Sequence, residues 1–271
     1  MLYFVSTPIG NLKDISFRAV EVLKQADVIA CEDTRHSLVL LNAYDIKKPL
    51  ISYHKFNESN ASDKIIELLR QGKEVAVISD AGTPIISDPG DVLSKKLIEN
   101  NLPYTVVPGA CAFVPALILS GLNEGRFYFY GFLPDKKGDI KRELESLNQI
   151  RVPIIFYCAP HDLTKTVEYL YEFLGERKAV AVKEITKIHE EVIRTTTDKA
   201  YEDYGETGLK GEIVLVLSGK PHKEEEETYT LSDAVEMAKK LIENGEKATT
   251  ASKEIASLTG FKKNEIYKEL L

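Results

Sequence analysis

Residues 75–90 read VAVISDAGTPIISDPG, an apolar run that passes directly into a polar loop rich in glycine and proline. Similar apolar runs at residues 2–6, 28–31 and 104–107 also end in polar or glycine-containing loops. Helices are expected between these runs, at residues 16–25, 62–70 and 92–99, where apolar residues recur at helical spacing. Continuous apolar strands that alternate with helices predict an α/β fold with a parallel sheet and helices on both faces.

Ligands of such sheets bind beyond the carboxyl ends of the strands. Those ends carry residues 7–11, 32–35, 80–84 and 108–112, so four polar or glycine-rich loops are expected to meet at one edge. Glycine lets the backbone approach a ligand closely, and proline stiffens the loop. The pattern predicts a pocket in which backbone groups hold an adenosine-bearing, partly cationic ligand. Turn formation alone remains the alternative explanation for each loop.

The second half alternates less regularly. Strands are expected at residues 126–132, 154–157, 179–185, 192–195 and 212–217, and helices at residues 141–147 and 163–174. Because helices separate only some of these strands, a mixed sheet is predicted. We expect α/β domains over residues 1–115 and 116–222, an acidic linker at 223–230 and a helical domain at 231–271. Three short helices at 231–244, 247–258 and 262–271 suit a helix-turn-helix bundle.

Composition narrows the class of protein. The chain has 271 residues, 44% of them hydrophobic and 28% charged, which is typical of a globular protein. Its formal net charge of −7 disfavours coating by nucleic acid through bulk charge, so an RNA partner would need a local patch. Prolines interrupt the longest uncharged stretch, at residues 102–123, so no membrane contact is expected. Three widely spaced cysteines predict neither a metal site nor a redox site and fit a reduced cytoplasm.

Two further groups of polar residues are candidates for a functional site. Glu32, Asp33 and Arg35 come directly after residues 28–31 and are either functional or the first turn of a helix. His54 and Lys55 either face a ligand or are solvated. The chain has no phosphate-binding G-x-x-x-x-G-K-[ST] loop, no G-x-G-x-x-G after its first strand and no H-E-x-x-H, so neither a metal nor a nucleoside triphosphate is indicated.

Three motifs together carry a family resemblance: TPIGNL at residues 7–12, EDTR at 32–35 and SDAGTPIISDPG at 79–90. Shorter matches occur at residues 108–109, 120–122, 131–134, 184–187 and 210–212. Over nearly its whole length the chain resembles the ribosomal RNA small subunit methyltransferase I family, within the tetrapyrrole methylase superfamily. The long motif at 79–90 is highly specific, whereas the short Gly-Pro pieces are not.

The resemblance implies two α/β domains with S-adenosylmethionine in the cleft between them, a small C-terminal helical domain and a homodimer. It implies 2′-O-methylation of a cytidine ribose in the decoding region of 16S rRNA, within the 30S subunit. It also implies cofactor-binding positions at Pro8, Asp80, Gly82, Thr83, Pro84, Ile85, Gly109, Ala110, Cys111, Ala112, Tyr157, Cys158, Ala159 and Val214.

A ribose hydroxyl is a poor nucleophile, so a base would assist the transfer. Glu32 and Asp33 are the base candidates, and Arg35 and Lys187 are expected to hold phosphate or stabilise the developing alkoxide. The full set of expected RNA contacts is Arg35, His54, Lys55, Lys187, Lys253, Lys262 and Lys263.

The sequence departs from the family pattern in three places. Residues 157–163 read YCAPHDL where an aromatic-Glu-Ala-Pro-His-Arg-Leu pattern is typical, so the usual acid and arginine are missing. Cys111 replaces a usual serine, and Lys183 replaces a usual arginine, which would lose bidentate contacts to phosphate. Two alternatives stay open: a methyltransferase for a corrin or porphyrin precursor, and an inactive cofactor-binding regulatory module.

Overall fold

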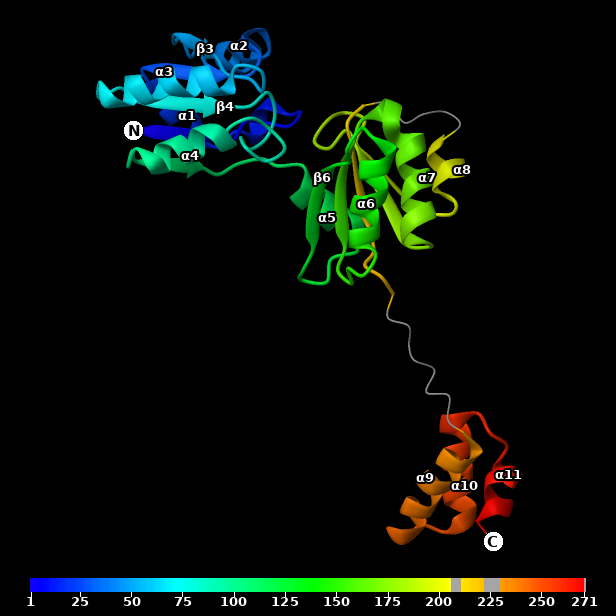
Figure 1. The fold of residues 1–271 in the computed structure, drawn as a ribbon. Helices are drawn as coiled ribbons and strands as arrows, with labels where there is room; N and C mark the ends of the chain where they lie inside the picture. Colours follow the sequence, from blue (N-terminus) through cyan, green and yellow to red (C-terminus); the bar gives the residue numbers. More distant parts are fainter. Residues whose placement is uncertain (206–210, 222–229, 271) are drawn as a thin grey trace. The chain divides into compact units, whose positions relative to one another are not determined.

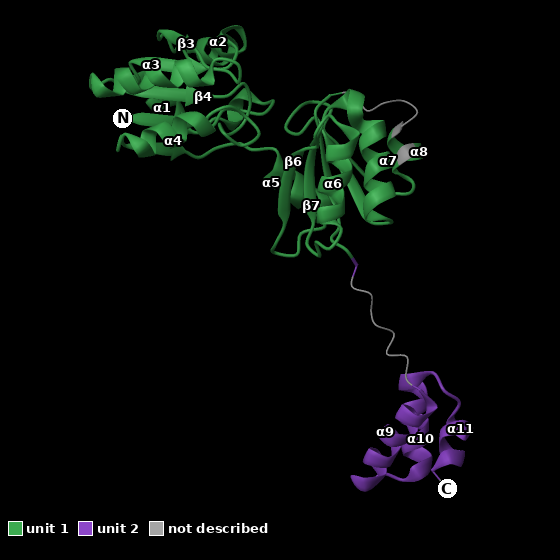
Figure 2. Cartoon of the chain, viewed as in Figure 1, with its two compact units in different colours: residues 1–220 green, residues 221–271 purple. Residues whose placement is uncertain are grey.

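The computed structural model describes residues 1–205, 211–221 and 230–270. The chain separates into two compact units, Met1–Lys220 and Pro221–Leu271 (Figure 2). The expected acidic linker at 223–230 lies outside the described residues except for Thr230. No helix in the described part of the chain has both the length and the apolar character that a membrane span needs.

The first sheet is entirely parallel, as predicted (Figure 1). Its strands are β1 (Leu2–Val5), β2 (Val28–Cys31), β3 (Leu50–Ser52), β4 (Val75–Ile78) and β5 (Tyr104–Val107). They lie in the order β3-β2-β4-β1-β5, so β1 and β4 are neighbours in the middle of the sheet. The loops that follow these two strands therefore start side by side.

Four helices cover the two faces of this sheet. They are α1 (Phe17–Gln25), α2 (Thr34–Ala43), α3 (Glu58–Arg70) and α4 (Asp91–Glu99), and a short 3₁₀ turn, η1, spans Leu12–Asp14. Alternate residues of β4 face opposite sides: Val75 and Val77 pack in the cluster that includes residues of α3 and α4. Ala76 and Ile78 pack in the cluster that includes residues of α1 and α2. Both faces of the strand are thus buried, which explains its continuous apolar sequence.

The second sheet is mixed, also as predicted. It consists of β6 (Tyr128–Phe132), β7 (Ile154–Cys158), β8 (Lys178–Lys183), β9 (Glu191–Thr196) and β10 (Ile213–Leu217), in the order β6-β7-β10-β8-β9. Among these, β6 and β7 pair in parallel, and the other neighbours pair antiparallel. Its helices are α5 (Phe113–Ser120), α6 (Lys137–Leu147), α7 (Leu163–Leu174) and α8 (Ala200–Gly205), with a 3₁₀ turn, η2, at Pro160–Asp162.

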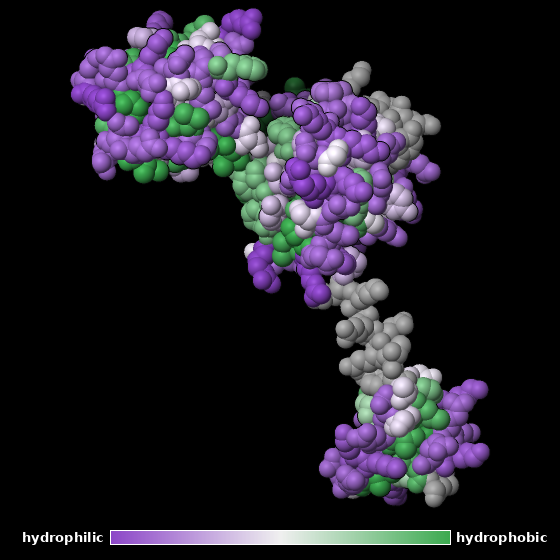
Figure 3. Space-filling model, viewed as in Figure 1, coloured by the Kyte–Doolittle hydropathy of each residue, from purple (hydrophilic) through white to green (hydrophobic). Residues whose placement is uncertain are grey.

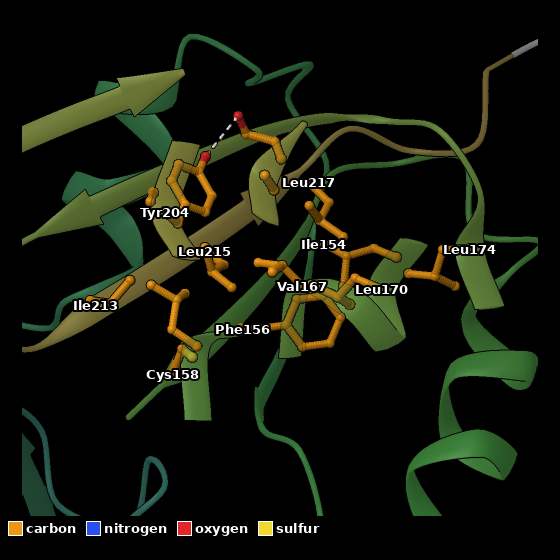
Figure 4. Packing of buried hydrophobic residues seen from close by; sticks show 14 of the residues in the cluster. Ile154, Phe156, Cys158, Val167, Leu170, Leu174, Tyr204, Ile213, Leu215 and Leu217 are labelled. Atoms are coloured by element: carbon orange, nitrogen blue, oxygen red, sulfur yellow. Dashed lines mark hydrogen bonds between the residues drawn. The ribbon is translucent and has the colours of Figure 1, made fainter. Parts of the chain in front are cut away.

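One face of the second sheet packs against α6 and α7 in an apolar cluster (Figure 4). Phe156 and Cys158 of β7 lie in this cluster, and the Tyr204 hydroxyl donates a 3.4 Å hydrogen bond to the Ala179 carbonyl. The opposite face packs against α5 and also against Ile9, from the loop after β1. The first-half loop therefore shares a core with the second sheet. Since α5 contacts strands of the second sheet, the chain joins that sheet near Phe113, and the predicted domain boundary after residue 115 stays a prediction.

The described part of the second unit, residues 230–270, forms a bundle of three helices. Its helices are α9 (Leu231–Glu243), α10 (Ala248–Thr259) and α11 (Lys263–Glu269). Ala234, Ala251, Ile255 and Ile266 are buried between them. Gly260 has a left-handed conformation (φ +77°) and ends α10, so that α11 can turn back onto it. The three predicted C-terminal helices are confirmed.

Candidate active site

The loops that follow β1 and β4 are joined by a pair of backbone hydrogen bonds. The Thr7 N–H donates to the Gly82 carbonyl at 2.8 Å, and the Gly82 N–H donates back to the Thr7 carbonyl at 3.0 Å. Gly82 adopts φ +84°, a conformation that L side chains rarely adopt, and a Cβ there would lie 3.4 Å from Ile9 Cγ2. Glycine thus permits the close approach of the two loops.

The loop at residues 108–112 packs against the same place. The Thr83 hydroxyl is 3.1 Å from the Ala110 carbonyl, to which it donates, and 2.9 Å from the Ser6 hydroxyl. A Cβ on Gly109 would lie only 2.8 Å from Ser6 Cβ, so a side chain there would push the loop away. These contacts bring three of the four predicted loops together, and a hydrogen bond from the Asp33 N–H to the Asp80 carboxylate joins the fourth.

The loop at residues 79–90 has an unusual backbone. Ile85 (φ +77°) and Ser87 (φ +66°) are both left-handed although neither is glycine. Gly90 packs so tightly under this loop that a Cβ would lie 2.5 Å from Ile85 Cγ1. Backbone strain of this kind persists only where the surroundings enforce it, and it is concentrated at functional sites.

A cavity of about 390 Å³, which we call the main cavity, lies between these loops and the second sheet. It is lined by Ile9, Asp80, Ala81, Thr83, Ile86, Ser87, Asp88, Cys111, Ala112, Phe132, Tyr157, Cys158, Ala159, Pro160, Ile185, Glu212, Ile213 and Val214. Small-molecule pockets in proteins have volumes of about 300–1,000 Å³. The cavity is thus large enough to take a small ligand and draws its walls from both halves of the first unit.

Eight of the fourteen predicted cofactor-binding residues line the main cavity: Asp80, Thr83, Cys111, Ala112, Tyr157, Cys158, Ala159 and Val214. The other six, all within the described range 1–205, lie in the same loops without lining it: Pro8, Gly82, Pro84, Ile85, Gly109 and Ala110. Gly82, Gly109 and Ala110 lie behind the cavity wall and hold the loops together through the contacts given above. Their roles toward a ligand stay predictions.

Sequence reasoning missed much of the wall that the second sheet provides. Phe132 and Glu212 lie within two of the short motifs noted in the sequence, yet neither was singled out. Phe132 was missed because its position depends on local features of β6 that centre on Gly131 (φ +86°). The pairing of β6 with β7 is irregular between Phe129 and Gly131. A Cβ on Gly131 would lie only 3.1 Å from Ser87 Oγ. The motif thus brings β6 against the loop at 79–90, and its next residue, Phe132, lines the cavity.

Cys158 lines the main cavity, and its side chain also belongs to the apolar core. It lies in the apolar cluster with Phe156 and Ile213, and its thiol contacts the Thr166 hydroxyl at 3.7 Å (Figure 4). Burial raises the pKa of the thiol to about 11. A buried neutral thiol is compatible with this core, whereas a carboxylate would need a partner there.

Carboxylates gather at the edge where β2 and β4 end. Asp80 and Asp88 line the main cavity, and Glu32 is half-buried nearby. Burial raises the pKa of Asp88 to about 6, a shift that the nearby charges of Glu32 and Asp80 increase. Burial also raises the pKa of Glu32, and Asp80 adds to that shift while His54 opposes it. No cluster of three or more His, Cys, Asp or Glu side chains in residues 1–205, 211–221 and 230–270 is arranged to hold a metal ion.

Asp33 and Arg35 serve the start of α2. The Asp33 carboxylate accepts a 2.8 Å hydrogen bond from the Arg35 N–H and forms an ion pair with the Arg35 guanidinium, also at 2.8 Å. These bonds hold the pKa of Asp33 at about 2, which makes it a weak base. The helix-start explanation of this motif is thus confirmed for Asp33, and Glu32 becomes the stronger candidate for a base.

His54 and Lys55 follow β3 at the same edge of the sheet. The Nδ1 atom of His54 is buried and has no hydrogen-bond partner among the described residues. Its backbone N–H donates to Asn57 Oδ1 at 2.9 Å, which fixes the turn into α3. Lys55 is exposed. Because His54 opposes the rise in the pKa of Glu32, the two side chains lie close enough to interact electrostatically.

Lys187 is held at the junction of the two halves. Its ammonium group forms ion pairs with Glu184 at 2.9 Å and Glu212 at 3.2 Å. A Cβ on Gly10 would lie 2.6 Å from Lys187 Cγ, so the lysine stem lies against the loop after β1. Because two carboxylates already neutralise the charge of Lys187, this lysine is a weaker candidate for binding phosphate than the sequence indicated.

The remaining predicted RNA contacts belong to the second unit. Lys253 lies on α10, Lys262 directly precedes α11 and Lys263 begins that helix. All three are exposed. They lie on α10 and at the start of α11, within the three C-terminal helices that the sequence predicted to form a helix-turn-helix bundle.

The residues of the main cavity fit the sulfonium cofactor that the sequence resemblance implies. Gly82 and Gly109 let three loops meet closely behind the wall of the cavity. Ile86, Ala112 and Val214 supply apolar surface for a ring system. Asp80 and Asp88 supply negative charge beside it, which suits a cation.

Comparisons with known proteins agree with this geometry. Residues 1–201 match the family model of the Tetrapyrrole (Corrin/Porphyrin) Methylases. The chain is 41% identical over 270 residues to ribosomal RNA small subunit methyltransferase I of Bacillus subtilis, covering 98% of this chain and 92% of that protein. It is likewise 41% identical over 273 residues to the protein of the same name from Haemophilus influenzae, covering 99% and 95%.

Solved structures of low sequence identity share the fold. A cobalt precorrin-4 methyltransferase superposes with a TM-score of 0.61 at 16% identity, covering 80% of this chain and 94% of that one. Diphthine synthase also gives 0.61 at 16% identity, covering 80% and 89%. Uroporphyrin-III C-methyltransferase from Thermus thermophilus, complexed with S-adenyl homocysteine, gives 0.57 at 17% identity, covering 80% and 96%.

Proposed function

Because the chain belongs to the ribosomal RNA small subunit methyltransferase I family of tetrapyrrole methylases, we propose that it methylates 16S rRNA with S-adenosylmethionine as donor. The proposed acceptor is the 2′-hydroxyl of a cytidine ribose in the decoding region, presented by the 30S subunit in the cytoplasm. The observation that carries the proposal is the main cavity, whose apolar residues and two carboxylates suit a sulfonium donor with a ring system.

The donor supplies an electrophilic methyl group on a positively charged sulfur. The chain's part is to bind and orient it: Ile86, Ala112 and Val214 would hold the ring system, and Asp80 and Asp88 would balance the positive charge. The strained loop at 79–90 fixes these carboxylates before the ligand arrives. Such preorganisation lets proximity and alignment supply much of the rate enhancement of a methyl transfer.

Glu32 is the proposed general base. It would accept the proton of the ribose hydroxyl as that oxygen becomes the nucleophile. Its burial and its proximity to Asp80 raise its pKa, and a carboxylate with a raised pKa is a stronger proton acceptor than an ordinary one. Asp33 is already committed to the Arg35 ion pair and to the start of α2.

The second unit is the proposed RNA anchor. Lys253, Lys262 and Lys263 lie on or beside α10 and α11, and lysines of this kind bind the phosphate backbone without reading sequence. Because the whole chain is acidic, such a local patch is required for RNA affinity.

We propose a homodimer for the first unit. Val114 and Ile118 of α5 are 41% and 67% exposed, and Phe127 and Tyr128 at the start of β6 are 43% and 42% exposed. Figure 3 shows green, hydrophobic surface along the part of the molecule that α5 and β6 occupy in Figure 1. Phe113 and Phe127 are 6.0 Å apart between ring centroids, so α5 and the start of β6 form one surface. Clustered exposed apolar residues of this kind mark association sites.

The test of the proposed function is a methylation assay on 30S subunits from a strain that lacks this activity. Mapping of 2′-O-methyl groups should show one new modified cytidine, which depends on both donor and protein. Methylation of a porphyrinogen in place of the subunit would favour the corrin or porphyrin alternative. Calorimetric binding of the donor without turnover on either substrate would favour the regulatory module. Light scattering of the wild type and Ile118→Asp tests the dimer, which the charge should dissociate.

A further inference from the structure

A second cavity of about 230 Å³, which we call the side cavity, lies next to the main one. The two cavities share Phe132, Tyr157, Cys158 and Ala159 as a common wall. The rest of the side cavity comes from residues 133–140 and 162–169. It therefore lies beyond the carboxyl ends of β6 and β7, the parallel pair of the second sheet, where α/β proteins bind ligands.

Aromatic rings reach the side cavity from two elements. Phe132, which is 56% exposed, makes an edge contact with Tyr157 at the strand ends, with ring centroids 5.4 Å apart. Tyr169 approaches from α7, and the Lys137 ammonium lies 5.7 Å from its ring centroid. Aromatic faces that remain accessible at a cavity are the usual platforms for unpaired nucleobases.

The charged groups at this cavity have both signs. Lys137 and Lys165 are exposed lysines, and Asp135 and Asp162 are carboxylates. Asp162 Oδ2 lies 3.1 Å from His161 Nε2, whereas Asp135 lies on the loop after β6. A balanced set of charges does not favour a simple anion. It favours a ligand that offers N–H donors to a carboxylate and a phosphate to a lysine.

We propose that the side cavity holds the base of the RNA nucleotide that receives the methyl group. The base stacks between the strand-end rings and Tyr169, and the exocyclic amine of a cytosine donates to Asp135, the pairing that acidic side chains make with cytosine. Lys137 and Lys165 contact the adjoining phosphates. The shared wall then places the ribose beside the main cavity. This inference rests on the proposed function and adds its base-recognition site.

The experiment compares two side-cavity variants, Asp135→Asn and Lys137→Ala, with two control variants, Asp139→Asn and Lys136→Ala. All four residues lie in the short segment 135–139. Neither control residue lines the side cavity, and all four variants keep the apolar core intact. For each protein, KM and kcat are measured on 30S subunits, the donor Kd by calorimetry and folding by thermal melting.

Each side-cavity variant should raise the KM for 30S subunits about tenfold, the effect of one lost hydrogen bond to a charged group, with the donor Kd unchanged within about twofold. The controls should match the wild type. A parallel loss of donor affinity would overturn the proposal, because the side cavity would then hold part of the donor. Unchanged KM values in both side-cavity variants would overturn it equally.

A direct binding measurement separates this proposal from the proposed function. Cytidine 5′-monophosphate is titrated into the donor-saturated full-length protein, and adenosine 5′-monophosphate is the comparison. Cytidine binding that Asp135→Asn weakens supports the side cavity even if 30S subunits are not methylated. Equal binding of both nucleotides, insensitive to Asp135→Asn, would refute it even if 30S subunits are methylated.

Discussion

The Asp33 N–H donates a 3.0 Å hydrogen bond to the Asp80 carboxylate, so the residue that precedes α2 is bonded to the loop that follows β4. Asp80 thus offers both a charge at the main cavity and an acceptor for the backbone. Asp80→Asn keeps the acceptor oxygen and removes the charge, and it should weaken donor binding about tenfold while leaving α2 intact. Asp80→Ala should also increase hydrogen exchange in the first turn of α2. Equal exchange in the two variants would contradict this division of roles.

The pKa of Asp88 near 6 predicts a pH dependence of donor binding. Above pH 6 the carboxylate is charged and attracts the cationic donor; below pH 6 it becomes protonated and the attraction is lost. The donor Kd should therefore rise as pH falls from 7 to 5, with a midpoint close to 6, and Asp88→Asn should flatten this profile. Calorimetry across that range provides the measurement, and an identical profile in the variant would rule Asp88 out as the titrating group.

The raised pKa of Asp88 affects the stability of the fold in the opposite direction from donor binding: protonation weakens donor binding but stabilises the folded protein. Because the folded state raises the pKa of Asp88 above its ordinary value of 3.8, the folded protein binds this proton more tightly than the unfolded chain does. The stabilising contribution is fully present below pH 3.8 and is lost as pH rises through about 6. Asp88→Asn should therefore raise the Tm relative to wild type more at pH 7.5 than at pH 5.

Glu32→Gln tests the proposed base. With saturating donor, the single-turnover rate of methylation should fall by about 10²–10⁴-fold, the usual contribution of general base catalysis. The donor Kd should stay within about threefold, because Glu32 is not among the residues that line the main cavity. Asp33→Asn is the matched comparison and should mainly disturb the start of α2. An unchanged rate in Glu32→Gln would remove Glu32 from the role.

Arg177 is a buried cation held by neutral acceptors. Only 3% of the residue is exposed, and its guanidinium donates to the carbonyls of Asn148, Ile150, Leu174 and Ser218 and to Asn148 Oδ1. Arg177→Met removes all of these hydrogen bonds and should cost about 3 kcal/mol of unfolding free energy, or about 6–12 °C in Tm. The exposed Arg126→Met should melt within about 2 °C of wild type. A similar Tm in both variants would show that the carbonyls find other donors.

Deletion of residues 229–271 tests the RNA anchor. The first unit has its own two sheets and cores, so the shortened chain should keep its donor affinity. Its affinity for 30S subunits should fall. In the full chain, replacing Lys253, Lys262 and Lys263 together by alanine should make the salt dependence of 30S binding less steep, by the equivalent of about two to three phosphate contacts. Unaltered 30S affinity in both proteins would locate the RNA contacts elsewhere.

The parallel first sheet and the meeting of its loops follow from local sequence, because each strand is buried on both faces and ends in a distinct loop. β3 was missed because its three residues lie next to Pro49 at an edge and are only partly buried. α5 was missed because its sequence, FVPALILS, is apolar on every side and contains Pro115, so no helical period is visible. α2 was anticipated only as the alternative explanation of Glu32–Arg35.

Some residues of the candidate site were likewise predicted from the sequence, and others were missed. Asp80, Thr83, Cys111 and Ala112 were implied by the family resemblance, and they lie in loops that the strand pattern had already predicted to meet at one edge. Phe132 and Glu212 were missed because their place depends on pairing across the second sheet and on the approach that Gly131 permits. Long-range register of this kind leaves no periodic trace in a single sequence.

The reciprocal bonds between Thr7 and Gly82 join two chain segments that are about seventy-five residues apart in sequence. Neither amide can reach solvent unless both segments separate, so the two amide protons should exchange with deuterium at a common rate. An insertion in one of these turns would displace the other as well. Natural variants of this protein should therefore keep both turns at constant length and accumulate their insertions elsewhere on the surface.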